Sequence, residues 1–136
     1  MKMHTRIAAA ALFTLIGVAS PAALSQEVRL GDIGRTNLMK EDLSIPGREV
    51  IQVRVDFPPG VSAVRHSHPG EELVYVIEGA LEYQLDGRAP VTLKAGDVLL
   101  IPYGTPHAVK NVGDGNAAEL ATYIVEKNQP LSALSD

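Results

Sequence analysis

The strongest constraint on the fold of this chain is a series of short segments in which apolar and polar residues alternate, separated by turns rich in Gly and Pro. From Ile51 to Phe57 every second residue is apolar, and a Pro-Pro-Gly run at residues 58–60 ends the segment. A period of two is typical of a half-buried β-strand. Further short segments that suit strands occupy residues 72–77, 81–85, 91–94, 98–101, 107–111 and 118–126. With turn signals about every 8–12 residues, the pattern predicts an all-β sandwich or barrel.

The beginning of the chain has a different character. Two basic residues precede an apolar run at residues 7–18, and small residues follow up to residue 25. This arrangement is typical of a secretory signal peptide, whereas a membrane span needs about 20 apolar residues. We expect cleavage before Gln26, with cleavage after Ala22 as the second choice, and export to the periplasm or the cell exterior.

Composition limits what the remaining chain can do. The 136 residues include 12 Lys+Arg, 16 Asp+Glu and no Cys. This length suits one domain, and without Cys the chain has no disulfides or thiolate-bound metals. The basic residues are scattered, so we expect no nucleic-acid partner and, after signal cleavage, no membrane partner. We predict a signal peptide at 1–25, a lead-in with the first strand at 26–47, a β-barrel domain at 48–126 and a C-terminal tail at 127–136.

Three histidines of the predicted mature chain stand where they suit a metal ion. His66 and His68 are two residues apart, so on an extended strand both imidazoles project from one face. Glu72 follows after a Pro-Gly turn, and a carboxylate beside two imidazoles completes a donor set for a divalent transition metal. His107 comes after a rigid turn that can bring a third imidazole inward. Glu71 has the opposite strand parity, and we expect it to be a solvated carboxylate.

The spacing of these residues resembles both conserved motifs of the cupin family. The first motif comprises a glycine, the histidine pair, the glutamate and a second glycine, and the second comprises a glycine, a proline, a glycine, a histidine and an asparagine. The matching residues are Gly60, His66, His68, Glu72 and Gly79, followed by Gly96, Pro102, Gly104, His107 and Asn111. Every motif position is filled, and the resemblance covers about residues 48–126.

The resemblance implies a jelly-roll barrel, or double-stranded β-helix, with one divalent transition metal held inside by His66, His68, Glu72 and His107. The metals implied are Fe, Mn, Ni, Cu or Zn. Four protein ligands leave about two positions open on a six-coordinate ion, and open positions are usual in catalytic metal sites. The motif glycines are interpreted as turn residues with positive φ, and Asn111 as a structural residue that bonds backbone or turn groups.

The sequence says less about residues that would contact a ligand without binding the metal. Arg54 is a candidate for holding a substrate carboxylate, with a surface cation as the alternative. Tyr83, Tyr103 and Tyr123 are candidate hydrogen-bond donors to a bound oxygen atom, with packing roles as the alternative. No histidine of the mature chain is left over to act as a general base.

Three classes of function suit these residues, and the resemblance implies the first. The first is a metal-dependent enzyme, dioxygenase-, decarboxylase- or isomerase-like, that acts on a small oxygenated organic substrate. The second is a non-enzymatic barrel that binds a metal or a small ligand, and the third is a purely structural role. The fold alone does not decide between them. Because the exposed edges of a small jelly roll favour pairing between copies, we also expect a homodimer.

Overall fold

The structure, a computed structural model, describes residues 28–136. The predicted signal peptide and its cleavage site lie outside these residues. Within the described range no helix is long and apolar enough to cross a membrane. The strands are β1 (Gly34–Asp42), β2 (Arg48–Phe57), β3 (Ser62–Ser67), β4 (Gly70–Glu78), β5 (Ala80–Leu85), β6 (Val91–Lys94), β7 (Val98–Ile101), β8 (His107–Asn111), β9 (Ala117–Glu126) and β10 (Ala133–Leu134).

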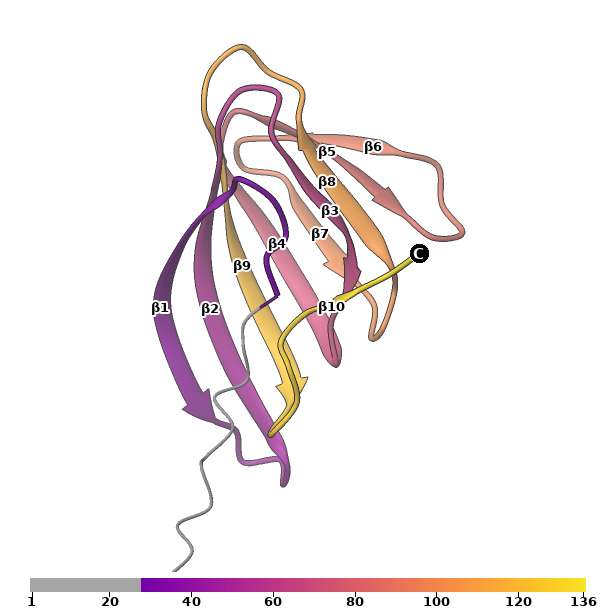
Figure 1. The fold of residues 1–136 in the computed structure, drawn as a ribbon. Coiled ribbons are helices and arrows are strands. Elements are labelled where there is room, and N and C mark those ends of the chain that lie inside the picture. Colours follow the sequence, from indigo (N-terminus) through magenta and orange to yellow (C-terminus); the bar gives the residue numbers. More distant parts are fainter. Residues whose placement is uncertain (1–27) are drawn as a thin grey trace, which may run out of the picture.

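The strands form two five-stranded antiparallel sheets that face each other (Figure 1). One sheet has the order β1-β2-β9-β4-β7, and the other has the order β10-β3-β8-β5-β6. Consecutive strands such as β3 and β4 belong to different sheets, so the chain crosses repeatedly between the two layers. This all-β architecture is a jelly roll, as the sequence predicts.

One apolar core fills the space between the sheets. In β2 the alternation predicted from the sequence is confirmed, because Val53, Val55 and Phe57 are at most 2% exposed. They belong to the same buried cluster as Leu81 and Tyr83 of β5, which come from the other sheet. Burial of these apolar side chains, at about 25 cal/mol per Å² of surface removed from water, is the main force that holds the two layers together.

The outer face of β4 and β7 is also apolar, although it is open to solvent. On β4, Leu73, Tyr75 and Ile77 are 38–48% exposed. On the neighbouring edge strand β7, Val98 is 70% exposed and Leu100 is 53% exposed. Residues of the opposite parity in β4 belong to the core. One stripe of β4 therefore builds the core, while the other forms an uncovered apolar surface on the described part of the chain.

Glycines mark both ends of β4. A Cβ on Gly70, where β4 begins against β9, would lie 2.6 Å from Val125 Cα. Gly79 has a φ of 75°, and a Cβ there would lie 2.7 Å from Ala117 Cα. Real Cβ atoms do not approach this closely, so both positions require glycine. The positive φ expected of the motif glycines is confirmed at all four.

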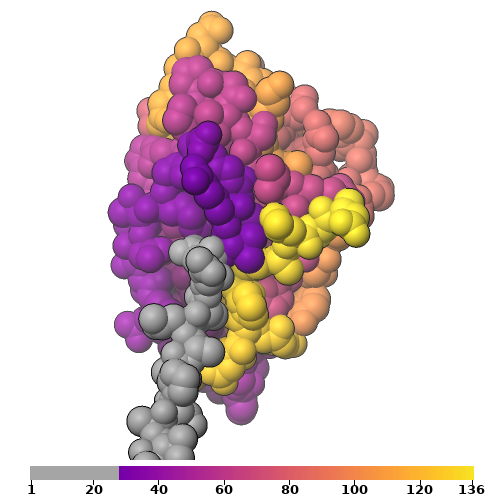
Figure 2. All heavy atoms as spheres, viewed as in Figure 1, coloured from indigo at the N-terminus to yellow at the C-terminus, as the bar shows by residue number. Residues whose placement is uncertain are grey.

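The two ends of the described chain lie side by side over one face of the barrel (Figure 2). Leu30 is 4% exposed, and its carbonyl accepts a hydrogen bond from Val64 N at 2.8 Å. At the other end β10 pairs with β3, and Leu131 packs against the core. The prediction of a simple tail at 127–136 missed this pairing, because a two-residue strand has no period to detect.

Candidate metal centre

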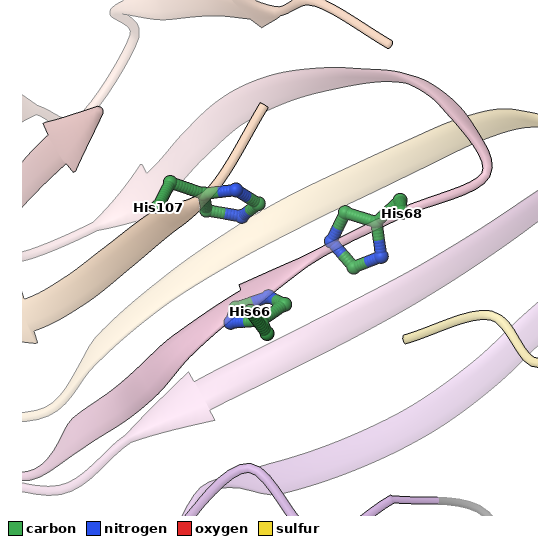
Figure 3. Close-up of side chains that lie close together, drawn as sticks. All are labelled: His66, His68 and His107. Atoms are coloured by element: carbon green, nitrogen blue, oxygen red, sulfur yellow. The ribbon is translucent and has the colours of Figure 1, made fainter. Parts of the chain in front are cut away.

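Three histidines converge inside the barrel (Figure 3). His66 lies near the end of β3, His68 lies in the connection to β4, and His107 begins β8. Their ring centroids are 4.3–5.2 Å apart, and a ring nitrogen from each lies within 4.8 Å of the others. All three side chains are buried. The sequence spacing thus brings the imidazoles together as predicted.

Each imidazole is oriented by a hydrogen bond from Nδ1 to a backbone carbonyl, at 2.6–2.9 Å. The acceptors are the carbonyls of Val64, Leu131 and Thr105, for His66, His68 and His107 in that order. Because a carbonyl oxygen can only accept, all three Nδ1 atoms carry the hydrogen. In the neutral imidazole the lone pair is then on Nε2, which is the nitrogen available to a metal.

Glu72 reaches the cluster from β4 of the other sheet and is 3% exposed. Its Oε2 lies 3.1 Å from Nε2 of His68 and 3.3 Å from Nε2 of His107. Neither Oε2 of Glu72 nor Nε2 of His68 has a hydrogen-bond partner among the described residues. Two buried acceptor atoms at this distance repel each other. The arrangement needs a positive charge between them, either a second proton on an imidazole or a metal ion.

The protonation states of His66 and Glu72 suit the binding of a cation. Burial lowers the pKa of His66 to about 4, and the neighbouring His107 and His68 lower it further, so its imidazole is neutral near pH 7. Burial alone would raise the pKa of Glu72, but His107 and His68, when their imidazoles carry the second proton, outweigh it through hydrogen bonds and charge and hold that pKa below its usual range. Glu72 is therefore an anionic carboxylate beside a neutral imidazole donor, and these are the forms that ligate metals.

This donor set fits a divalent transition ion. Imidazole nitrogens suit Fe, Ni, Cu and Zn, and a carboxylate oxygen also suits Mn. The carbonyls that accept from Nδ1 fix each ring and its tautomer, as is common around metal-binding histidines. Three buried imidazoles and one buried carboxylate with an unpaired oxygen are hard to account for as core packing alone.

A small cavity of about 10 Å³ adjoins the cluster. This is about the space that one water molecule needs. Its wall includes three residues of the cluster, His66, Glu72 and His107. The polar side chains that complete the wall are Arg35, Glu119 and Tyr123, and the rest of the lining is apolar. A ligand that is larger than water requires this wall to open.

Two of the four residues predicted to act beyond the metal lie near the cavity. Tyr123 is 2% exposed, lies opposite Glu72 in the β4–β9 pair, and has its ring centroid 4.7 Å from that of His68. Tyr83 is fully buried, and its hydroxyl donates to Glu119 Oε2. Burial raises the pKa of both tyrosines well above the usual range, so both keep their hydroxyl hydrogen.

The other two predicted residues lie away from the cavity. Arg54 has the opposite parity to the core residues of β2, and its guanidinium pairs with Asp56 and Glu78 at 2.9 Å. Tyr103 is exposed, and its hydroxyl donates to Glu126 at 3.1 Å. The surface position of Arg54 agrees with the alternative considered for it, whereas Tyr103 is exposed rather than packed in the core. Glu71, expected to be solvated, is half-buried and belongs to the opposite face of β4 from Glu72.

Asn111 has the structural role expected of it. Its amide donates to the carbonyls of Phe57 and Gly115, both at 2.8 Å, and its Oδ1 accepts from Gly113 N at 2.9 Å. These bonds tie the end of β2 to the loop between β8 and β9. Asn111 therefore supports the barrel without taking part in the histidine cluster.

Sequence reasoning missed three contributors to the site: Arg35, Glu119 and Leu131. Glu119 had a detectable signal, since it shares strand parity with apolar residues of β9 and is therefore a carboxyl group on a core-facing stripe. Arg35 lies in the Gly-punctuated lead-in, where no period guides interpretation. Leu131 acts through its backbone carbonyl, which no side-chain pattern reveals.

Comparison with known proteins agrees with this geometry. The sequence model described as "Cupin domain" matches residues 53–125. A germin-like protein of Arabidopsis thaliana, subfamily 2 member 2, is 33% identical over 119 residues, which cover 82% of this chain and 52% of that protein. An oxalate-binding protein of Thermotoga maritima is 29% identical over 96 residues, which cover 70% of this chain and 78% of that protein.

A solved structure of oxalate oxidase in complex with the substrate analogue glycolate superposes with a TM-score of 0.62. It is 25% identical, and the match covers 82% of this chain and 60% of the other. The chain spans about half the length of the germin-like relatives it matches. Since the family match covers more than half of the chain and includes all the clustered residues, the chain belongs to the cupin domain family.

Proposed function

We propose that this chain is an exported, metal-dependent cupin enzyme that acts on a small carboxylic acid. The observation that carries the proposal is the convergence of His68 Nε2 and Glu72 Oε2, two buried acceptors 3.1 Å apart with no hydrogen-bond partner among the described residues. A divalent cation satisfies both atoms and also the Nε2 atoms of His66 and His107. We assign these four residues as its ligands.

The names of relatives support the substrate class. One relative is an oxalate-binding protein, and a structural neighbour is an oxalate oxidase that holds glycolate. Another relative is a dimethylsulfoniopropionate lyase from Ruegeria pomeroyi, 36% identical over 56 residues. The ligands named are small molecules that carry a carboxylate. We extend this class, and none of the particular reactions, to the present chain.

A bound transition metal would supply a Lewis acid that polarises a substrate oxygen and, if it is redox-active, a partner for electron transfer. The chain itself contributes orientation and charge. The carbonyls of Val64, Leu131 and Thr105 fix the three imidazoles, and the Glu72 carboxylate offsets part of the metal charge. The apolar residues of the cavity wall lower the local dielectric constant and strengthen each polar contact beside them.

The second candidate is a non-enzymatic barrel that holds a metal or a small ligand. The cavity volume of about 10 Å³ favours it, because this space admits a water molecule and no organic substrate without movement of the wall. The wall includes Leu30 and Ile33 of the lead-in, which precede β1. In the enzyme proposal this segment moves to admit substrate, whereas a metal store has no need of such movement.

We also propose that the chain forms a homodimer through the uncovered apolar surface of β4 and β7. Contiguous exposed apolar residues are uncommon on monomers and mark interfaces. Most side chains of this surface are uncharged, so a second copy of the same surface would meet it without burying unpaired charges.

The deciding experiment uses the mature chain without a histidine tag, purified from its native compartment. Elemental mass spectrometry would measure bound Mn, Fe, Co, Ni, Cu and Zn per chain. Near-stoichiometric metal together with turnover of a small carboxylic acid supports the enzyme. Stoichiometric metal with saturable acid binding and no product supports the binder. No bound metal after reconstitution with these ions overturns the enzyme and the metal store, and leaves a metal-free barrel that binds a small ligand.

A further inference from the structure

Glu119 is a carboxyl group on the core-facing stripe of β9, where its neighbours of the same parity are Ala117 and Ala121. It is 3% exposed. Taking a carboxyl group out of water is costly unless it is protonated, hydrogen-bonded or used by a ligand. No ion pair involving Glu119 within 4 Å is present in the described part of the chain. A buried carboxyl at this position therefore needs an explanation beyond packing.

Tyr83 satisfies one oxygen of Glu119. The Tyr83 hydroxyl reaches across from β5 of the opposite sheet and donates to Glu119 Oε2. Because Tyr83 is fully buried, this bond fixes the orientation of the carboxyl group. The proton of the carboxylic acid then belongs on Oε1, the oxygen that Tyr83 does not occupy.

Glu119 and the histidine cluster share one cavity wall. The same small cavity is lined by Glu119, His66, Glu72 and His107. A molecule bound at the cluster and extending into this cavity would meet the Glu119 carboxyl. Glu119 thus belongs to the site, although it does not contact the imidazoles in the way that Glu72 does.

The surroundings favour the protonated form. Burial raises the pKa of Glu119 to about 8, and the negative charge of Glu72 adds to the effect, against smaller opposing contributions from Tyr83 and Arg35. Near pH 7 the group is a neutral carboxylic acid, which can donate a hydrogen bond.

We propose that Glu119 is a ligand-contacting residue whose carboxyl O–H, held in place by Tyr83, donates a hydrogen bond to an oxygen atom of the small carboxylate bound at the metal centre. The inference rests on the proposed function for the metal and the anion. It adds a source of specificity for anionic ligands. A neutral carboxylic acid at Glu119 stabilises an anionic ligand oxygen, whereas an ionised carboxylate would repel it.

The test measures binding of oxalate and glycolate to the Mn²⁺-loaded protein by titration calorimetry between pH 7 and pH 9. For the wild type we expect affinity to fall about tenfold over this range, because the protonated fraction of a group with a pKa of about 8 falls by that factor. The Glu119→Gln variant keeps an N–H donor, so its affinity should stay within about threefold of wild type at pH 7 and vary little with pH. The Glu119→Leu variant lacks a donor and should bind about tenfold more weakly.

Other groups that face Glu119 do not produce this profile. His66, His107 and Glu72 are held by the metal in their deprotonated forms. Tyr83 and Tyr123 keep their protons over the whole range, since burial raises the pKa of each well above the usual value. The remaining charged side chain of the cavity wall is that of Arg35. A change in affinity between pH 7 and pH 9 therefore reports Glu119.

Glu49→Gln is the matched control. Glu49 is also buried, but it pairs with Lys40 at 3.3 Å and is not among the residues that line the cavity. Its variant should bind both acids with wild-type affinity and a wild-type pH profile. Melting temperatures of all variants would separate loss of folding from loss of binding.

The outcomes distinguish this inference from the proposed function. If the metal-loaded wild type, Glu119→Gln and Glu119→Leu bind both acids with the same affinity and pH profile, Glu119 is only a core residue and the inference is wrong. If the metal-loaded wild type binds neither acid, the proposed substrate class fails and the inference fails with it. Infrared spectra of the metal-free protein at pH 6 give a second readout. A protonated-carboxyl band that is present in the wild type and absent from Glu119→Gln supports the inference, and its absence from the wild type overturns it.

Discussion

His66 and His107 are direct partners across the β3–β8 strand pair. Backbone pairing alone therefore makes two of the three imidazoles neighbours, with ring centroids 4.3 Å apart. The third imidazole, His68, lies just beyond β3, and the next strand places Glu72 in the other sheet. The cluster thus sits where the chain crosses between sheets, and its geometry depends on the barrel being closed.

The first prediction concerns the metal ligands. Replacing His107 or Glu72 by Ala should lower the metal content of the purified protein about tenfold or more, because each removes one donor from a buried site. Glu71→Ala is the matched control. Glu71 has the opposite strand parity to Glu72, so this variant should keep the metal content of the wild type. Elemental mass spectrometry of untagged protein measures the difference. Equal losses in the Glu71 and Glu72 variants would contradict the assignment.

The second prediction concerns stability. A metal that binds only the folded barrel stabilises it by mass action, about 2.7 kcal/mol when the free ion is at 100 times its Kd. Removing the metal with a chelator should therefore lower the melting temperature by several degrees. The His107→Ala variant should show little response to the chelator. If the chelator leaves the melting temperature of metal-containing wild-type protein unchanged, the ion is not bound inside the folded barrel.

The third prediction tests the close approach of β4 and β9. Gly70→Ala would place a Cβ 2.6 Å from Val125 Cα, so the strands must separate next to His68 and Glu72. We expect a loss of about 1–3 kcal/mol in the free energy of unfolding, together with weaker metal binding. Gly34→Ala is the control, because its Cβ would lie an ordinary 3.4 Å from Asp56 Cβ. Denaturant unfolding of both variants would show whether only the Gly70 change is costly.

Most strand positions could be predicted because this barrel buries one face of most strands and separates the strands with Gly and Pro. The predicted bounds of β6, β7 and β8 coincide with those found, and β9 begins one residue earlier than predicted. The prediction failed where the signal is too short or is carried by the backbone. The pairing of β10 with β3 involves two residues, and no period of two can be seen in so short a segment.

The candidate site, too, could be predicted only in part. The four proposed ligands were found from their spacing, because side chains with metal-binding chemistry occupy fixed offsets in the sequence. The carbonyl that orients His68 belongs to Leu131, 63 residues away, and only tertiary structure brings the two together. Glu119 was overlooked even though its parity placed a carboxyl group on the core side of β9. A polar residue on an apolar stripe is thus the signal that sequence reasoning should have used.

The fourth prediction tests the proposed homodimer. Val98→Glu would place a charge on a residue of the uncovered apolar surface that is 70% exposed, on the edge strand β7. Burying that charge in an interface of two copies is costly, so the variant should be a monomer. Ile45→Glu is the control, because Ile45 is 59% exposed outside β4 and β7. Light scattering coupled to size-exclusion chromatography measures the mass. A wild-type monomer, or a Val98→Glu dimer, would rule out this interface.

The fifth prediction concerns the pH dependence of stability in the metal-free protein. Burial raises the pKa of Glu119 from 4.5 to about 8, so between these values the folded state holds a proton that the unfolded chain has released. The free energy of unfolding should therefore fall as the pH rises through this window, by at most about 1.4 kcal/mol per pH unit. His66 acts in the opposite direction only below its ordinary value of 6.5, so the range from pH 6.5 to 8.5 isolates Glu119. Glu119→Gln carries no titrating proton, and its stability should vary less than that of the wild type over this range. Urea unfolding at several pH values, with chelator present, measures both curves, and parallel curves would mean that Glu119 is ionised in the folded protein throughout.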